Sequence, residues 1–344
     1  MARARKLEPA VMKIVSATAA LPPLQQSSFT FDVSQMVSIL NRRFYRQGLQ
    51  WVVGGIKFTA SGFKGPVYTT KLPSTWTMSN AWHKGFASWQ RMNDRALEGA
   101  ESVRPKFLDF KIYANAAHHL AGFDANMKPV CTPGDPALTP PLEEATMGEW
   151  ESSKIAQPVT GPAVADPGEV FEREIIATGA NYPGIGFSGL NAVSLIEGYA
   201  NSRRLPDVLD PNTPDDAQDT DGATPENWIG SLFNEGTQQS SELIGVLTNE
   251  NNLAPYPFEN DGVNLDTMYP GGENQLSGME IHDISHVTST TIGATTRIPG
   301  GVFPCGLIQM LVDNTEDTDG YLLLEISLVP GPHRGYLAEP MQDM

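Results

Sequence analysis

The 344 residues of this chain predict an all-β fold with helical excursions, arranged as a β-sandwich. Its 32 glycines and 27 prolines favour turns, and only 18% of its residues are charged. Segments that alternate apolar and polar residues lie near both ends of the sequence, with long stretches of other character between them. This distribution predicts a sandwich whose first and last strands meet.

The N-terminal elements begin with an arm. Residues 1–26 are basic at the start and rich in alanine, and we interpret them as a flexible arm. Residues 28–33 alternate and predict a strand. Asp32 or Ser34 can then cap a short helix that continues to Phe44.

Two strands and a long helix follow. Residues 51–59 and 67–72 read as strands, and the glycine-containing turn between them predicts a hairpin. Gly54 and Gly55 indicate a bulge or a close backbone approach within the first of these strands. Residues 77–98 repeat apolar and aromatic side chains along one helical face, a spacing that favours a role in the core over base stacking.

The middle of the chain is poorer in periodicity and richer in proline. We interpret residues 115–168 as a surface insertion. The elements expected in this region are, in order, strands over 107–113, 154–159 and 169–177, a helix over 190–202, an acidic loop over 205–226 and a helix over 228–247.

The C-terminal part is strongly β. Residues 286–296 are rich in threonine, which favours a strand. Residues 303–312 and 321–329 alternate, and the turn that ends in Asp319-Gly320 predicts that they form a hairpin.

Charge is divided along the sequence. Residues 1–111 hold 16 Lys and Arg against 6 Asp and Glu, whereas residues 112–344 hold 7 against 34. An acidic protein repels nucleic acid as a whole, but one whose positive charge is collected in one segment can bind a polyanion with one face. The division therefore predicts a basic side that contacts DNA and an acidic side that faces away from it.

The basic residues are the candidate nucleic-acid contacts. Four lie on the arm: Arg3, Arg5, Lys6 and Lys13. Three more crowd one short segment: Arg42, Arg43 and Arg46. If that segment is helical, Arg42 and Arg46 share a face where like charges repel, and a phosphate between them relieves the cost. An internal ion pair or a salt bridge between subunits is the alternative role.

Other classes of site find little support. Neither Asp215–Gly222 nor the stretch before Gly320 matches a calcium-binding loop, so we expect no cofactor, with calcium at subunit interfaces as an open alternative. The two cysteines do not have metal-ligand spacing. No apolar run is long enough to span a membrane, and no paired catalytic motif stands out, so we expect neither a membrane protein nor an enzyme.

Several segments resemble a known family. Asn41–Gly48, Thr75–Lys84, Pro304–Leu307, Leu328–Gly335 and Leu337–Met341 are similar to segments of the capsid proteins of small circular Rep-encoding single-stranded DNA viruses. The resemblance covers roughly residues 28–114 and 300–341.

The resemblance implies a jelly roll of viral capsid type over residues 27–344, with insertions 115–168 and 200–275 as surface loops or a small projection. It further implies that the chain self-assembles into the icosahedral shell of a virion and packages circular single-stranded DNA. The alternative is a secreted or surface β-sandwich that binds a glycan or a protein partner.

Overall fold

The computed structural model describes residues 10–99, 109–132, 142–158, 170–181, 192–202, 278–288 and 294–344. The chain divides into two compact units. The first consists of Met1–Ser74, Ala121–Glu151 and Glu280–Met344, and the second of Thr75–Leu120 and Ser152–Met279. The expected acidic loop over 205–226 and helix over 228–247 lie outside the described residues.

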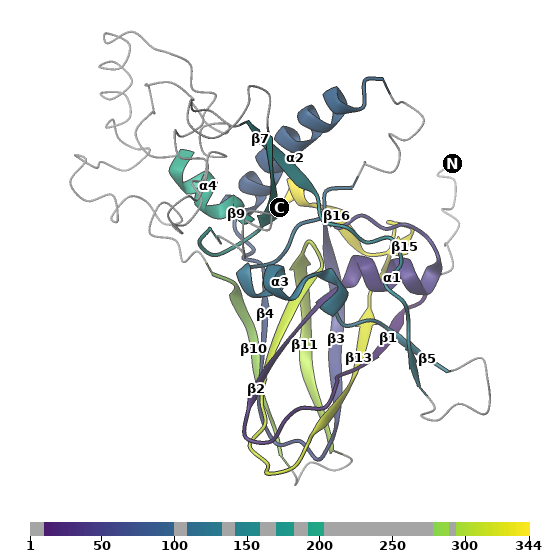
Figure 1. The fold of residues 1–344 in the computed structure, drawn as a ribbon. Coiled ribbons are helices and arrows are strands. Elements are labelled where there is room, and N and C mark those ends of the chain that lie inside the picture. The colour runs from purple at the N-terminus through teal and green to yellow at the C-terminus, as the bar shows by residue number, and fades with distance from the viewer. Residues whose placement is uncertain are drawn as a thin grey trace, which may run out of the picture. The chain divides into compact units, whose positions relative to one another are not determined.

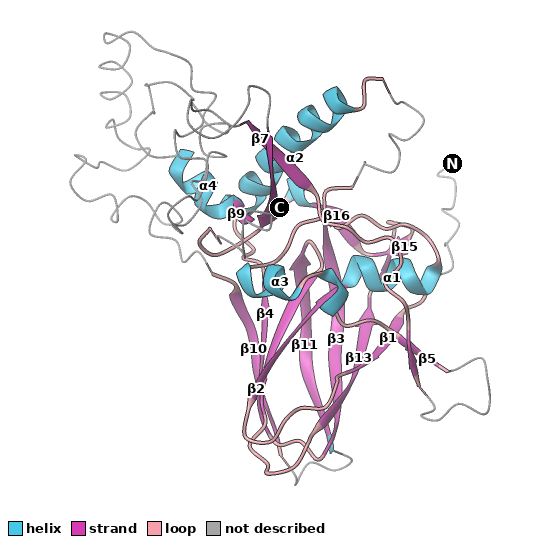
Figure 2. Ribbon diagram, in the orientation of Figure 1, coloured by secondary structure: helices cyan, strands magenta, loops and turns pink. Residues whose placement is uncertain are grey.

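The first unit is built on two antiparallel sheets (Figures 1 and 2). Across the first sheet the order is β1 (Lys13–Ala17), β13 (Tyr321–Leu328), β3 (Leu49–Ser61) and β11 (Thr295–Pro304), and β16 (Ala338–Pro340) also pairs with β3. Across the second sheet it is β10 (Glu280–Val287), β4 (Gly65–Lys71), β12 (Leu307–Asp313) and β2 (Gln26–Asp32).

These eight main strands pair by a simple rule. Counted along the chain, the first pairs with the eighth (β1 with β13), the second with the seventh (β2 with β12), the third with the sixth (β3 with β11) and the fourth with the fifth (β4 with β10). The expectation that strands from the two ends of the sequence meet is confirmed by β1 and β13, which lie side by side in Figure 1.

Both predicted hairpins are wrong. β3 and β4 follow one another but lie in different sheets, and so do β12 and β13. The connections between them cross from one sheet to the other, because each strand finds its partners far away in the sequence. A turn signal shows that the chain reverses, and it does not show which strand becomes the neighbour.

The core of this unit lies between the sheets. Along β4, β12 and β13 alternate residues are buried, as the period of two requires. Ile56, Phe58 and Ile326 face the core from the first sheet, and Phe31 and Met310 face it from the second. The predicted strands over 28–33, 51–59 and 67–72 are confirmed by β2, β3 and β4.

Part of the expected arm is a strand. β1 lies within residues 1–26, and its Ile14 and Ser16 are buried. The Ser16 hydroxyl donates to the Lys128 carbonyl at 2.6 Å. The alternation extends over only five residues, too few to separate a strand from an arm by sequence.

Shorter elements complete the first unit. They are α1 (Val33–Asn41), β5 (Val130–Cys131) with β6 (Glu143–Glu144), β14 (Pro330–Gly331) with β15 (Gly335–Tyr336), and the 3-10 turns Phe123–Ala125 and Met341–Asp343. Helix α3 (Ala116–Ala121) ends where the chain re-enters this unit.

The second unit contains α2 (Trp76–Ala96), β7 (Lys154–Pro158), β8 (Val170–Ile176), β9 (Ala192–Ser194) and α4 (Leu195–Ser202). β7 pairs antiparallel and β9 pairs parallel with β8. Of the strand expected over 107–113, the described residues 109–113 form one bridge, from Tyr113 to Ile176.

The long helix takes the place predicted for it. Thr75 caps α2, and its hydroxyl accepts from the Met78 amide. Trp82 and Trp89 are buried with their rings around Phe110, so the aromatic stripe is core, as predicted. Of the helices in the described ranges, none combines the length and apolar content needed to cross a membrane.

Candidate nucleic-acid interface

The candidate residues of the arm separate into two groups. Arg3, Arg5 and Lys6 lie outside the described residues. Lys13 begins β1, and its side chain is 67% exposed. Its ammonium donates to the Glu325 carboxylate on the neighbouring strand at 2.6 Å.

The three clustered arginines follow α1 rather than continue it. The helix ends at Asn41, and Arg42 has left-handed backbone angles, φ 51° and ψ 40°. The amides of Arg42 and Arg43 close the last turn on the carbonyls of Ile39 and Ser38. The helical spacing predicted for Arg42 and Arg46 is therefore wrong, although both side chains are exposed.

Buried anchors explain why the helix stops there. The Tyr45 amide donates to the Ser38 hydroxyl at 3.0 Å, which pulls the chain back toward the helix. Tyr45 and Gln47 are buried, whereas Arg42, Arg43 and Arg46 between and before them are exposed. Because the buried Tyr45 and Gln47 hold the segment in place, the arginines beside them point to solvent. Within the described residues, Arg42 and Arg46 have no acidic partner.

The buried carboxylate of Asp32 holds both the start of α1 and the segment that contains the arginines. Asp32 caps α1, accepting from the amides of Ser34 and Gln35 and from the Ser34 hydroxyl. Its other oxygen accepts from the Gln47 side chain at 2.9 Å. Burial raises the pKa of the Asp32 carboxyl from 3.8 to about 6, and these hydrogen bonds offset the increase only in part.

The segment is also held from the C-terminal side. The Arg334 guanidinium donates to the Phe44 carbonyl at 2.7 Å, and the Tyr45 hydroxyl donates to the Arg334 carbonyl at 3.3 Å. Arg334 is exposed with a φ of 49°, so a fourth arginine joins the three predicted ones. We call Arg42, Arg43, Arg46 and Arg334 the arginine turn.

An aromatic cluster fixes the base of the arginine turn. The rings of Tyr45, Trp51 and Tyr336 meet edge to face at 5.5 to 6.0 Å between centroids. The Tyr336 hydroxyl accepts from the Asn41 amide group and donates to the Val11 carbonyl, both at 2.7 Å. These two hydrogen bonds connect the paired strands β14 and β15 to α1 and to the residues before β1.

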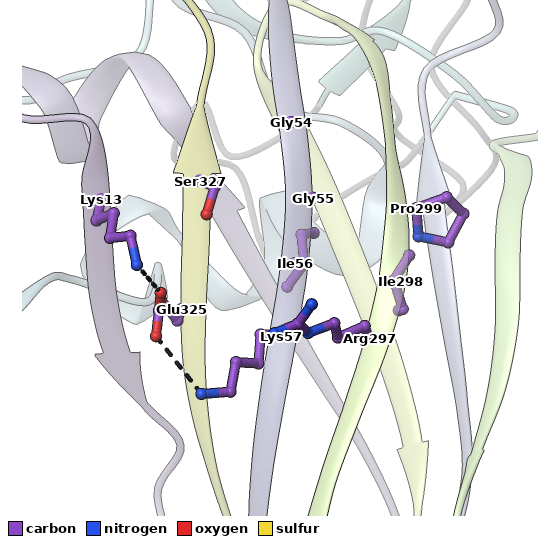
Figure 3. Close-up of a pocket in the computed structure, with 10 residues that line it drawn as sticks. All are labelled: Lys13, Gly54, Gly55, Ile56, Lys57, Arg297, Ile298, Pro299, Glu325 and Ser327. Atoms are coloured by element: carbon purple, nitrogen blue, oxygen red, sulfur yellow. Dashed lines mark hydrogen bonds and ion pairs between the residues drawn. The ribbon is translucent and has the colours of Figure 1, made fainter.

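A second basic group lies on the outward face of the first sheet (Figure 3). Lys57 on β3 is the register partner of both Glu325 on β13 and Arg297 on β11. Its ammonium lies 3.8 Å from the Glu325 carboxylate, which also binds Lys13. Arg297 has no ion-pair partner in the described part of the chain, so three cations surround one carboxylate.

These charges border a hollow with glycine at its floor. Its volume is about 390 Å³, and its lining includes the three cations, Glu325, Gly54, Gly55 and Pro299. Ser327 and Leu328 are adjacent on β13 but pair with Gly55 and Val53, so β3 carries one extra residue. This is the bulge predicted at Gly54-Gly55. We call this feature the sheet hollow.

A close backbone approach accompanies the bulge. A Cβ on Gly300 would lie 2.3 Å from the Val53 carbonyl oxygen and 2.6 Å from the Gly54 backbone. Glycine is therefore required on β11 for the two strands to pair at this point.

The electrostatics of the sheet hollow are dominated by its cations. The hydrogen bond and charge of Lys13, followed by the charges of Lys57 and Arg297, hold the pKa of the Glu325 carboxyl below its ordinary value. Lys57 and Arg297 were not among the predicted contacts. Their proximity depends on the register of β3 with β11, for which no local pattern in the sequence gives a signal.

A buried polar cluster in the second unit contains the histidine His119. The His119 ring and the Ser152 hydroxyl both bind Glu174, at 2.6 and 2.5 Å. Burial raises the pKa of this carboxyl, but the bonds from His119 and Ser152 outweigh burial and leave it below its ordinary value. Glu174 stands between the serine and the imidazole, so the imidazole is not placed to take the serine proton.

Within the described ranges, no group of three or more His, Cys, Asp or Glu side chains is placed to hold a metal ion. The acidic stretch Asp215–Gly222 lies outside those ranges.

The two basic groups share a chemistry. The arginine turn presents exposed arginines, and the sheet hollow presents lysines and an arginine that solvent reaches. The lining of the sheet hollow contains no aromatic ring on which a base could stack. Such groups suit contacts with phosphates, which carry no sequence information. No protein-family model, curated protein or solved structure matches this chain.

Proposed function

We propose that the chain is the coat protein of a single-stranded DNA virus, that its sandwich is a jelly roll, and that it self-assembles into an icosahedral shell around circular DNA. The virion is then its location. The strand pairing of the first unit carries this proposal.

The pairing rule has a direct topological meaning. A long antiparallel hairpin with four strands in each arm pairs first with eighth, second with seventh, third with sixth and fourth with fifth. When it is rolled up, alternate pairs fall in opposite sheets, which gives the two Greek keys of a jelly roll. The orders β1-β13-β3-β11 and β10-β4-β12-β2 agree with this result. Jelly rolls are a recurrent architecture of viral capsids.

The arginine turn supports the packaging role. Arg42 and Arg334 both have left-handed backbone angles, which favour glycine over a side chain with a Cβ. Strained residues of this kind concentrate at functional sites. The exposed guanidinium of Arg42 has no acidic partner among the described residues and can meet a phosphate, whereas that of Arg334 already donates to the Phe44 carbonyl and also positions the turn.

Electron microscopy of the purified full-length chain tests assembly. Uniform spherical shells that protect DNA from nuclease are the expected result. Dispersed monomers over a range of salt concentration and pH contradict the proposal and favour the alternative of a surface binding module.

The packaging contacts can be tested separately. With about seven phosphate contacts, the affinity for single-stranded DNA falls with salt with a log–log slope of about −5. The triple variant Arg42→Ala, Arg43→Ala, Arg46→Ala is expected to flatten that slope by about 2. A matched variant loses three lysines that already have acidic partners, namely Lys64, Lys128 and Lys154. Equal slopes for the two variants would rule out the arginine assignment.

A further inference from the structure

We infer that the sheet hollow is a phosphate-binding site for single-stranded DNA, with Lys57 and Arg297 as its principal contacts and Glu325 as the group that the phosphate displaces. The identity of the polyanion rests on the proposed function, whereas the anion site rests on the geometry of the sheet alone.

The charges around the sheet hollow are unbalanced. Lys57 and Arg297 are direct register partners on neighbouring strands, an arrangement in which like charges destabilise a sheet. One carboxylate, Glu325, serves Lys13 at 2.6 Å and Lys57 at 3.8 Å, and it leaves Arg297 without an ion pair among the described residues. An anion bound between Lys57 and Arg297 removes the repulsion.

The sheet hollow has room for a phosphate between these two cations. Side chains on paired residues of adjacent strands stand about 5 Å apart, so Lys57 and Arg297 can both reach one phosphate group. Gly54 and Gly55 place no side chain on the floor, and the bulge at this point opens the sheet surface. The hollow of about 390 Å³ can therefore admit a phosphate with its sugar.

The positions of the three cations fit a polyanion with several phosphates in a row. Lys13 stands two strands beyond Lys57, about 10 Å across the sheet, which places it beside the next phosphate of a strand that crosses the β-strands. With no aromatic residue in the lining, the site contacts the backbone and leaves base identity unread. We therefore expect binding that is independent of sequence and strongly dependent on salt.

The test measures binding of a fluorescent 30-nucleotide oligo-dT to the full-length chain by anisotropy, under conditions where subunits are dispersed. The double variant Lys57→Ala, Arg297→Ala is expected to weaken binding about 25-fold at 0.1 M salt and to flatten the log–log salt slope by about 1.4, the effect of two phosphate contacts. Because the substitution also removes a like-charge pair, the variant is expected to unfold at the same temperature or higher.

The matched control is Lys64→Ala, Lys128→Ala, which removes the same charge from two lysines that have acidic partners in the same unit. It is expected to leave the salt slope unchanged. Glu325→Gln is expected to tighten binding about fivefold, because it releases the cations from their internal partner.

Equal weakening in the double variant and in its control would overturn the site. Selective loss of heparin binding with unchanged oligo-dT binding would assign the hollow to a sulfated glycan and overturn the DNA proposal. The binding test uses dispersed subunits, so it does not depend on shell formation. If the chain forms no shells but the double variant still loses oligo-dT binding, the phosphate site stands and the proposed function fails.

Discussion

Replacing Asp32 with asparagine tests the energetic role of the buried carboxylate beneath the arginine turn. The side chain is fully buried and binds Ser34, Gln35 and Gln47. Asparagine has the same shape and keeps one oxygen to accept from the helix amides. Its NH₂ can donate to Gln47 once the Gln47 amide turns its oxygen toward it. The substitution therefore removes the charge and retains the cap.

The expected magnitude follows from the raised pKa of Asp32. A folded pKa of about 6 against an ordinary value of 3.8 corresponds to about 3 kcal/mol. Near pH 4 the folded protein keeps the carboxyl protonated and the cost is small. As the pH rises from about 4 to about 6, the unfolded chain loses its proton first, so the wild-type protein becomes less stable. Above about pH 6 the cost is complete and no longer changes.

Urea unfolding followed by tryptophan fluorescence, at pH values from 4 to 8, measures this term. The stability of Asp32→Asn relative to wild type is expected to rise by about 2.5 kcal/mol between pH 4 and pH 7. Asp317→Asn, at an exposed position, is the control for a change in net charge. A difference between Asp32→Asn and wild type that stays constant with pH would refute the reasoning.

Three further predictions concern the backbone and the aromatic cluster. Arg42→Gly relieves a left-handed conformation, so the free energy of unfolding is expected to rise by about 0.5–1 kcal/mol while the affinity for oligo-dT falls. Gly300→Ala forces a Cβ against the Val53 carbonyl and is expected to cost about 1–3 kcal/mol, whereas Gly99→Ala, with open space around it, should leave that free energy nearly unchanged. Tyr336→Phe removes two hydrogen bonds and is expected to cost about 1–3 kcal/mol by urea unfolding, with unchanged circular dichroism as the check that the fold is intact.

Local patterns predicted the elements well, and they failed on partners. The 3.6-residue period located α2, and the period of two located β12 and β13, because both are properties of neighbouring residues. The Asp319-Gly320 signal correctly indicated a reversal, but the chain passes from one sheet to the other there. The strand with which a given strand pairs depends on which faces of the sheets are buried together. A short window of sequence does not hold that information.

The candidate site shows the same division. The arginines at positions 42, 43 and 46 were predicted to contact DNA, which stays a prediction. Their helical spacing was wrong because α1 ends at Asn41 and the Tyr45 amide bonds back to Ser38. Lys13 was predicted as part of an arm and is a strand residue. Lys57 and Arg297 are 240 positions apart and meet only through pairing register, so sequence reasoning had no means of joining them.

The pairing of first strand with last has a kinetic consequence. Lys13 and Glu325 are 312 residues apart, so β1 cannot pair with β13 until nearly the whole described chain has left the ribosome. Domains dominated by such distant pairings fold slowly, in milliseconds to seconds for small examples and more slowly as length grows. Until then β1 and β3 expose unpaired edges to other copies of the chain.

The second unit bears on this delay. Its segments lie between Lys71 and Glu280 in the sequence. These two residues are register partners where β4 pairs with β10. The entropy lost on closing a loop grows with the length of flexible chain, so a segment that is already compact shortens the effective loop. Early collapse of the second unit would then bring β4 and β10 within reach of each other, and this unit would hasten the pairing of the strands that precede and follow it in the sequence.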